Sequence, residues 1–301
     1  MDGSKSYEGG AAPCVIITTD DVEIDGLTIQ GGRALGNINQ YSFLFRSGGG
    51  ILAYSENFPY GEYTEVDGFY LRNCTFRDNQ SIESGAPLFF YSINKPNVVV
   101  QNCLFEENGF EAPTNWASLI EVGIANYISG DTFPEFLIDA CTFRNNSETY
   151  ATTLSINLGV KITVSNCLFE QSGGRDQILA TSSDVLTVRD CRFLNSYGTA
   201  LTGMAEKNAT VERCVFKGKE GVPGQGGISL FALDKLHVSG CLFDFVGNFD
   251  NAAPSILVTS STILDACTFH EQFPLILFPP AGSMTFLATN CILQGELLYT
   301  P

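Results

Sequence analysis

The chain repeats one short pattern of apolar and polar positions along most of its length. The clearest copy is Val164-Ser165-Asn166-Cys167-Leu168-Phe169, in which an aliphatic residue, a cysteine and a phenylalanine are the apolar positions. Ten copies can be aligned, mostly 23 to 29 residues apart, beginning at Ile24, Leu71, Val100, Ile138, Val164, Val188, Val211, Val238, Leu264 and Ala288. A fixed period of this length is typical of solenoids, in which each repeat forms one turn of a coil.

Each copy predicts two strands separated by a sharp bend. Alternation such as Ile162-Thr163-Val164 is typical of a strand with one buried face. The alternation then slips by one residue before the cysteine. The slipping position is usually Asn, Asp or Gly, which tolerate the left-handed backbone region, so we expect a corner there. The exceptions at this position are Ala140, Arg213 and Ala266.

A third strand and further corners complete each period. An additional apolar run appears in nearly every period, for example Leu154-Ser155-Ile156, and an asparagine three residues after the phenylalanine marks a second corner at Asn79, Asn108 and Asn146. The sequence lacks a 3.6-residue pattern and is rich in Val, Thr, Phe and Asn, which excludes helical repeats. We therefore predict an all-β fold: a single right-handed parallel β-helix solenoid of about ten coils, with stacked inward ladders of Cys and Phe.

The repeat extends through nearly the whole chain, so we expect residues 1–301 to form a single domain after a loose lead-in at 1–13. The first and third periods are the longest, which predicts long loops at 31–47, 56–68 and 109–135. The chain starts and stops inside the repeat. We therefore expect it to be a segment of a longer protein, with neighbouring chains or domains capping its open ends.

The net negative charge of the chain restricts the classes of molecule that it can bind. The chain carries 16 Lys and Arg against 33 Asp and Glu, a net charge of −17, and therefore lacks the basic surface that nucleic acid requires. Anionic lipids and polyanionic sugars are disfavoured in the same way, whereas neutral glycans, cations and basic protein surfaces remain open. No apolar stretch approaches the roughly 18 residues of a membrane span, so we expect no membrane insertion.

Nine of the ten cysteines occupy the inward slot of the repeat. Residues stacked on adjacent parallel strands lie about 4.8 Å apart, within reach of a disulfide, but their parallel Cβ directions disfavour its torsion near 90°. We therefore expect a column of free core thiols, and the cysteine count leaves the redox compartment open. The spacing of these cysteines and of His237 and His270 does not give a tetrahedral metal cluster, so we expect no metal and no cofactor.

The long loops concentrate aromatic residues beside acids, and we predict a contact surface for a glycan or a protein there. Ring faces can pack against sugar C–H groups while carboxylates accept hydrogen bonds from hydroxyls. The alternative is that the rings anchor long loops to the coil. The predicted binding residues are Tyr54, Tyr60, Glu62, Tyr63, Asp67, Trp116 and Tyr127.

The segments Glu23–Gly32, Gly48–Leu52 and Asn73–Asn79 resemble the right-handed β-helix repeats of the pectin-lyase-like superfamily. The likeness is closest to the polymorphic outer-membrane-protein type and to bacterial surface proteins with similar repeats. Their signatures are a Phe-x-x-Asn tetrapeptide, present here as Phe76…Asn79, and a Gly-Gly-Ala-aliphatic tetrapeptide, present as variants. The resemblance implies a surface-displayed adhesin or glycan-interacting stalk, located at the cell surface or outside the cell.

The same superfamily includes polysaccharide lyases and hydrolases. Resemblance to polygalacturonases would imply clustered Asp residues with His-Gly and Arg-x-Lys segments, yet neither histidine precedes a glycine and Arg-x-Lys is absent. Catalytic residues therefore stay unassigned. We predict a non-catalytic extracellular module for adhesion, glycan contact or structural display. The alternatives are a polysaccharide lyase or glycosidase, and a rod-like structural subunit of a larger assembly.

Overall fold

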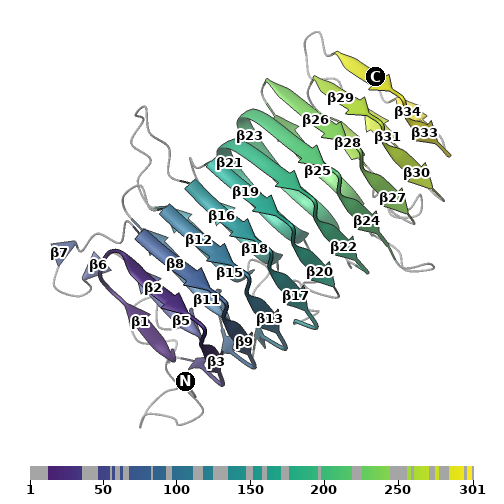
Figure 1. The fold of residues 1–301 in the computed structure, drawn as a ribbon. Coiled ribbons are helices and arrows are strands. Elements are labelled where there is room, and N and C mark those ends of the chain that lie inside the picture. Colours follow the sequence, from purple (N-terminus) through teal and green to yellow (C-terminus); the bar gives the residue numbers. More distant parts are fainter. Residues whose placement is uncertain are drawn as a thin grey trace.

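The computed structural model describes residues 13–35, 47–54, 56–57, 62–63, 68–82, 84–92, 97–110, 118–124, 135–146, 152–157, 161–170, 176–195, 198–218, 226–232, 234–244, 256–258, 261–270, 275–277, 285–294 and 297–299. Every regular element within these ranges is a β-strand. The strands stack as parallel turns of a coil that progresses from β1 at the N-terminal end to β34 at the C-terminal end (Figure 1).

The first face of the coil holds the strands that precede the cysteines. Equivalent residues pair in parallel between turns, as Ile138 does with Val164 and Val164 with Val188. The strands are β2 (Val22–Asp25), β8 (Gly68–Arg72), β12 (Asn97–Gln101), β16 (Glu135–Asp139), β19 (Lys161–Ser165), β21 (Asp176–Arg189), β23 (Thr199–Glu212), β26 (Lys235–Ser239), β29 (Thr262–Asp265) and β32 (Phe286–Thr289).

The second face follows the cysteines and contains the phenylalanine ladder. Among the described residues it is a ten-stranded parallel sheet. Its strands are β3 (Thr28–Gln30), β9 (Thr75–Arg77), β13 (Leu104–Glu106), β17 (Thr142–Arg144), β20 (Leu168–Glu170), β22 (Arg192–Leu194), β24 (Val215–Lys217), β27 (Leu242–Asp244), β30 (Thr268–His270) and β33 (Ile292–Leu293).

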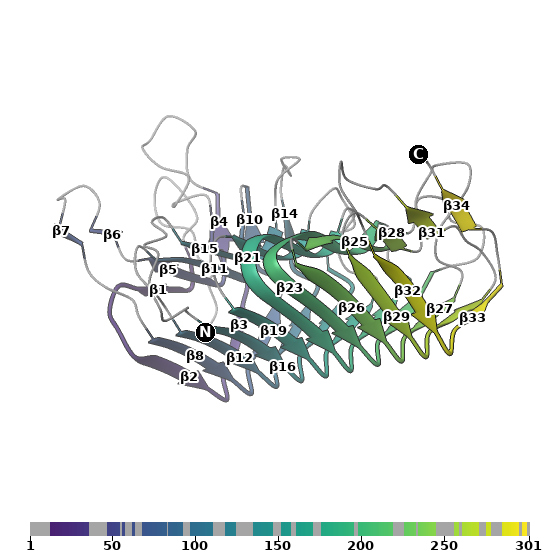
Figure 2. The same ribbon diagram turned by 90° about the horizontal axis from the view of Figure 1, so that it is seen from above.

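The third face closes the coil opposite the corner at which the first and second faces meet (Figure 2). Its strands are β1 (Val15–Ile17), β5 (Ile51–Tyr54), β11 (Leu88–Ser92), β15 (Ser118–Ile124), β18 (Thr152–Asn157), β25 (Gly226–Ala232), β28 (Ile256–Val258), β31 (Leu275–Leu277) and β34 (Leu297–Tyr299), together with the N-terminal halves of β21 and β23. A small parallel sheet of β4 (Arg33–Ala34), β10 (Gln80–Ser81) and β14 (Gly109–Phe110) follows the second face. The strands β6 (Glu56–Asn57) and β7 (Glu62–Tyr63) pair antiparallel with each other.

The predicted corner between the first and second faces is confirmed at every copy of the repeat. All ten slipping residues have φ between 50° and 70°, including the three that are not Asn, Asp or Gly. They are Gly26, Asn73, Asn102, Ala140, Asn166, Asp190, Arg213, Gly240, Ala266 and Asn290. The alternation in the sequence therefore slips because the backbone turns there, and the cysteine and the aliphatic residue both point inward.

The predicted ladders form the core. Phenylalanine rings from Phe76 to Phe269 stack on successive turns, with centroids 4.6 to 5.0 Å apart and planes within 13° of parallel. The cysteines from Cys74 to Cys267 are at most 3% exposed, while Cys291 in the last described repeat is half-buried. Stacking of these rings adds to the free energy gained by burying each of them.

Asparagines form a third ladder at the second corner. Asn79, Asn108 and Asn146 are 0 to 1% exposed. The Asn108 amide donates to Asn146 Oδ1 at 3.1 Å, and its own Oδ1 accepts from the Asn79 backbone N–H and side-chain amide at 3.1 and 3.0 Å. Each buried amide thus satisfies backbone groups of the neighbouring turn, which is why Asn recurs there.

The third corner differs from the prediction in two of the shortest periods. We expected three separate strands per period, but β21 and β23 each run for 14 residues through the third and first faces without a break. Their register shifts between Ala180, Ser183 and Val185, which marks a β-bulge at the bend. A bulge changes the strand direction without the extra residues that a loop requires.

Parts of the predicted loops are strands as well. The range 31–47 contains β4, the range 56–68 contains the β6–β7 hairpin, and the range 109–135 contains β14 and β15. Strand β15 pairs with β11 and β18, since Ile120 and Val122 continue the inward alternation of the third face.

Candidate functional site

A column of paired charges runs along the outer surface of the second face. It consists of the residue after the phenylalanine in successive repeats, and we call it the charge column. In its first part Glu106 lies in register between Arg77 and Arg144 on adjacent strands. Glu106 Oε1 accepts from Arg77 Nε at 2.9 Å, and Oε2 accepts from Arg144 Nε and Nη2 at 3.0 and 2.7 Å. One carboxylate thus links three turns of the coil.

Burial and charge fix the ionisation of Glu106. Its side chain is only 7% exposed, although both arginine side chains are about half exposed. Hydrogen bonds from Arg77 and Arg144 lower the pKa of the Glu106 carboxyl, and this effect exceeds the opposing effect of burial. Glu106 is therefore an anion at neutral pH, held by two cations.

The charge column has a second cluster in the C-terminal half. Asp244 lies between Lys217 and His270, with Lys217 Nζ 3.1 Å from Oδ2 and His270 Nδ1 2.9 Å from Oδ1. Burial alone would raise the pKa of Asp244, but the hydrogen bonds from His270 and Lys217 lower it. This cluster resembles the first in form, with one partly buried carboxylate between two positive or hydrogen-bonding partners.

Further acids are paired at the first corner. Asp139 accepts from Ser165 Oγ at 2.7 Å and from Asn166 Nδ2 at 2.8 Å, one turn away. Asp190 binds Arg213 through both carboxylate oxygens, at 2.7 and 2.8 Å. Partners from a neighbouring turn again explain the lowered pKa of Asp139 and Asp190. Each contact ties one turn to the next.

These surfaces hold carboxylates as anions rather than preparing one to donate a proton. A glycosidase general acid requires a carboxyl group with a raised pKa, whereas in the part of the chain that the structure describes, every carboxyl with a resolved shift is lowered. These residues are Glu106, Asp139, Asp190, Asp244 and Asp265. These five acids are therefore suited to pairing with groups on neighbouring turns.

The sequence analysis did not predict the charge column, although the sequence contains a pattern that indicates it. Aligning the repeats on the phenylalanine places Arg77, Glu106, Arg144 and Glu170 in one position, with alternating signs. Alternating charge at a fixed repeat position predicts pairing between turns, since equivalent residues in a parallel coil become neighbours.

The structure places three of the seven predicted contact residues on strands. Tyr54 belongs to β5, and Glu62 and Tyr63 belong to β7, where Tyr63 pairs with Glu56. Tyr60, Asp67, Trp116 and Tyr127 lie outside the described residues. Of the residues predicted to form the contact surface, the structure therefore describes the backbone of Tyr54 and of the β6–β7 hairpin, and the contact surface itself stays a prediction.

A small outward-facing apolar cluster lies on the third face beside these segments. Leu52 and Phe89 pair across β5 and β11, and they are 1% and 2% exposed although their neighbours Leu88 and Phe90 fill the core. Tyr91 stacks on Phe89 with ring centroids 6.4 Å apart. Leu52 and Phe89 are therefore withdrawn from solvent, while Tyr91 is half-buried.

Within the described ranges, no group of three or more His, Cys, Asp or Glu side chains is arranged to hold a metal ion. The same part of the chain contains no helix that is long and apolar enough to cross a membrane.

Comparison with known proteins agrees with the architecture. Residues 122–271 match the family model described as Right handed beta helix region. No curated protein and no solved structure matches the chain. The predicted right-handed parallel β-helix is thereby confirmed, and the finer likeness to the polymorphic outer-membrane-protein type stays a prediction.

Proposed function

Since this chain carries a right-handed β-helix region, we propose that it is a non-catalytic contact module, a rigid coil that displays loops at its N-terminal third to a glycan or protein surface outside the cell. The observation that carries this proposal is the pairing of the described surface acids. Glu106, Asp139 and Asp244 are each bound by partners on neighbouring turns and have a lowered pKa. Their charge stabilises the coil, which leaves the loops for contact.

The β6–β7 hairpin supports the placement of the contact surface. Its two strands pair with each other rather than with the coil in the described part of the chain, and Figure 2 shows them beyond the stacked turns. The hairpin carries Glu62 and Tyr63, an acid and an aromatic residue. Aromatic side chains bring large contact area at low cost in conformational entropy, and tyrosine is enriched where binding energy concentrates.

A glycan array with a second readout for newly released reducing sugar ends tests this function. We expect binding without release of reducing ends. Substituting Tyr60, Tyr63 and Trp116 together by Ala should weaken binding at unchanged thermal stability. The matched control is Tyr70→Ala, because Tyr70 lies on the first face of the coil with the Arg72 guanidinium 5.6 Å from its ring centroid. Release of reducing ends, or binding that survives the triple substitution, would contradict the proposal.

A second candidate, a structural subunit of a larger assembly, is favoured by the apolar residues of the outermost described turns. Ile16 and Leu27 near the N-terminal end are 51% and 40% exposed, and Leu287 and Ile292 near the C-terminal end are 47% and 58% exposed. Light scattering after size-exclusion chromatography separates the two functions. Association that depends on concentration and disappears in Ile292→Lys, but persists in Met204→Lys in the middle of the coil, would favour the subunit.

A further inference from the structure

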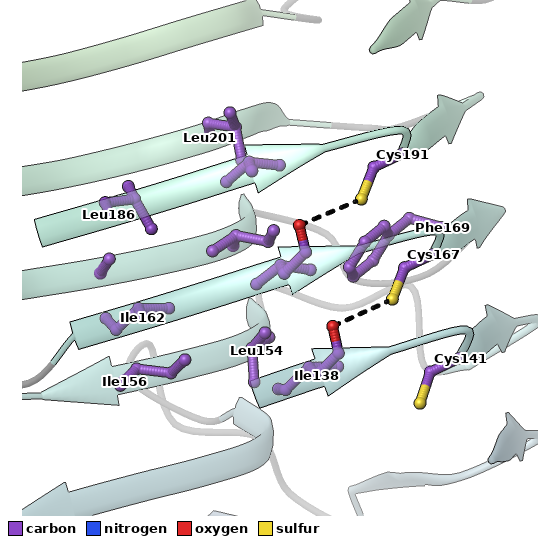
Figure 3. Packing of buried hydrophobic residues seen from close by; sticks show 14 of the residues in the cluster. Ile138, Cys141, Leu154, Ile156, Ile162, Cys167, Phe169, Leu186, Cys191 and Leu201 are labelled. Carbon is purple, nitrogen blue, oxygen red and sulfur yellow. Dashed lines mark hydrogen bonds between the residues drawn. The ribbon is translucent and has the colours of Figure 1, made fainter. Parts of the chain in front are cut away.

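The second face of the coil carries two columns of side chains on its outer surface. One is the charge column, and the other consists of the residue before the phenylalanine on successive strands, which we call the flanking column. Figure 3 shows Cys167 and Phe169 among the core side chains, and Leu168 between them belongs to the flanking column, where it is half-buried. Apart from Arg192, the flanking column between β9 and β33 consists of Thr, Leu, Val and Ile: Thr75, Leu104, Thr142, Leu168, Val215, Leu242, Thr268 and Ile292.

The second face is not acidic, although the chain as a whole is. The chain has a net charge of −17, whereas the ten described strands of this face carry four basic residues and three acidic ones. They are Arg77, Arg144, Arg192 and Lys217 against Glu106, Glu170 and Asp244. Two copies of an acidic chain repel each other, and this repulsion is weakest between surfaces whose own charges balance. The charge on the second face therefore does not oppose contact with a second copy.

Two-fold symmetry restricts how two second faces can meet, because the same surface of each copy forms the contact. If the symmetry axis runs along the strands, the two coils are antiparallel and each column faces the same column of the other copy. If the axis runs along the coil, the columns are exchanged, and an apolar residue such as Leu104 faces Glu106 of the other copy. The antiparallel arrangement therefore keeps apolar side chains against apolar side chains and charges against charges.

We propose that the second face binds a second copy of this chain in an antiparallel arrangement, with the two-fold axis at β22. Leu194 then meets its own copy on the axis, while β20 faces β24, β17 faces β27, and β13 faces β30. In the flanking column Leu168 faces Val215 and Thr142 faces Leu242. The charge column places Glu170 opposite Lys217, Arg144 opposite Asp244 and Glu106 opposite His270, and each contact occurs twice.

The pattern of charges selects this position of the axis. An axis at β20 would oppose Glu170 to its own copy, and an axis at β24 would do the same to Lys217. An axis midway between β20 and β22 would oppose Arg144 to Lys217, and one midway between β22 and β24 would oppose Glu170 to Asp244. Among these five positions, the axis at β22 avoids contacts between like charges in the charge column. The flanking column contains one such contact, that of Arg192 with its own copy.

The size of this surface predicts a weak dimer. Nine strands, β9 to β33, overlap between the two copies, which gives a contact about 40 Å long and, for strands of two or three residues, about 10 Å wide. Such an area lies at the low end of specific protein interfaces, so we expect dimerisation to depend on concentration. The dimer does not rest on the proposed function, but it would place the contact loops of the two copies at opposite ends, and two linked sites bind an extended partner more tightly than one.

Sedimentation equilibrium of the full chain over a wide range of concentrations tests the proposal. We expect a reversible increase from the mass of one chain to that of two. Leu194→Lys should abolish this increase, because it places two positive charges together on the axis. Leu137→Lys is the matched control, since Leu137 is half-buried on the outer surface of the first face, and it should leave dimerisation unchanged. Arg192→Leu should shift dimerisation to about tenfold lower concentrations, because it removes the one contact between like charges.

Exchanging two charges tests the position of the axis. Glu170→Lys and Lys217→Glu should each raise the dissociation constant about tenfold or more, whereas the two substitutions combined should restore it. The two residues lie on β20 and β24, separated by β22 within one chain, so they meet only across the interface. Circular dichroism confirms the fold of each variant. A monomer at every concentration, dimerisation of Leu194→Lys, loss of dimerisation in Leu137→Lys, or a combined variant that stays weakened would each overturn the proposal.

Discussion

Three corner residues adopt a backbone conformation that their side chains disfavour. Ala140, Arg213 and Ala266 have φ of 52°, 50° and 51°, in the left-handed region where a Cβ atom costs about 1–2 kcal/mol. Arg213 gains a compensating ion pair with Asp190. The two alanines are exposed and make no such contact with their methyl groups, so the coil imposes their conformation.

Ala140→Gly should therefore stabilise the protein. Glycine removes the conformational penalty, while its greater freedom in the unfolded chain returns about 0.5–1 kcal/mol, so we expect a gain of about 0.5–1 kcal/mol in the free energy of unfolding. The midpoint of urea denaturation measures it. Ala288→Gly is the control, because Ala288 is exposed on a strand, and it should be destabilising. A destabilised Ala140→Gly would show that the corner is not strained.

The side chain of each buried asparagine forms hydrogen bonds with backbone groups of the neighbouring turns. Asn108→Ala would remove the acceptor of the Asn79 N–H and the donor to the Phe76 carbonyl, both buried. Each buried group left without a partner costs about 1–3 kcal/mol, so we expect the loss of these two partners to lower the free energy of unfolding by about 2–6 kcal/mol. Asn208→Ala on the exposed surface of β23 should change stability by less than about 0.5 kcal/mol. Equal effects of the two substitutions in urea denaturation would refute the ladder.

At the scale of the elements, strands with few residues are joined by side chains that reach from one turn to the next. The second face has strands of only two or three residues, yet Phe76, Phe105 and Phe143 stack below it while Arg77, Glu106 and Arg144 pair above it. Both layers depend on the same parallel register. A charge pair is therefore a property of neighbouring strands rather than of either residue.

The charge column predicts the dependence of stability on pH. The folded-state pKa of Glu106 lies below its unfolded value, which is about 4.3. Its contribution to stability is therefore complete above that pH and is lost as the pH falls through the folded-state pKa. We expect Glu106→Gln to be less stable than the unsubstituted protein at neutral pH, with a difference that shrinks on acidification.

Denaturation midpoints measured at several pH values between neutral and acid check this expectation. Glu107→Gln is the control, because Glu107 is exposed and adjacent in sequence. A difference between Glu106→Gln and the unsubstituted protein that stays constant down to the acid end would argue against the ion pairs as its origin.

For the whole molecule, the important property is that each turn contacts only its neighbours. Interior turns are covered on both sides, so their thiols are withdrawn from solvent, whereas Cys14 and Cys291, in the outermost described turns, are half-buried. The stability of such a coil is approximately a sum of the contacts between neighbouring turns.

This difference in exposure between the interior and the outermost described turns predicts the reactivity of the thiols. Cys14 and Cys291 are partly exposed, and the other eight cysteines are buried. Reactivity requires an accessible thiolate. In the interior, a hydrogen bond to the Cys214 thiol and burial raise the pKa of Cys241 to about 12. Iodoacetamide should therefore modify Cys14 and Cys291 in the native protein and the remaining eight after unfolding, as peptide mass spectrometry would show. Modification of Cys241 at the rate of Cys14 would contradict the burial of the interior cysteines.

The sequence by itself determined the period, the parallel coil, the inward cysteine and phenylalanine positions and the corner at the slipping residue. Each follows from local chemistry, because alternation decides which side chains point inward and a slip in the alternation requires a turn. Even Ala140 and Arg213, which do not favour a corner, were placed correctly by the residues around them.

Only the tertiary structure decided which charges meet. Glu106 binds partners 29 and 38 residues away, across segments of different length, so the shared register rather than the distance along the chain brings them together. The bulged corners of β21 and β23 and the strands within the predicted loops also depend on neighbouring turns. The physical reason is that a repeat specifies its own inward face, whereas contacts on the outer face exist only after adjacent turns have stacked.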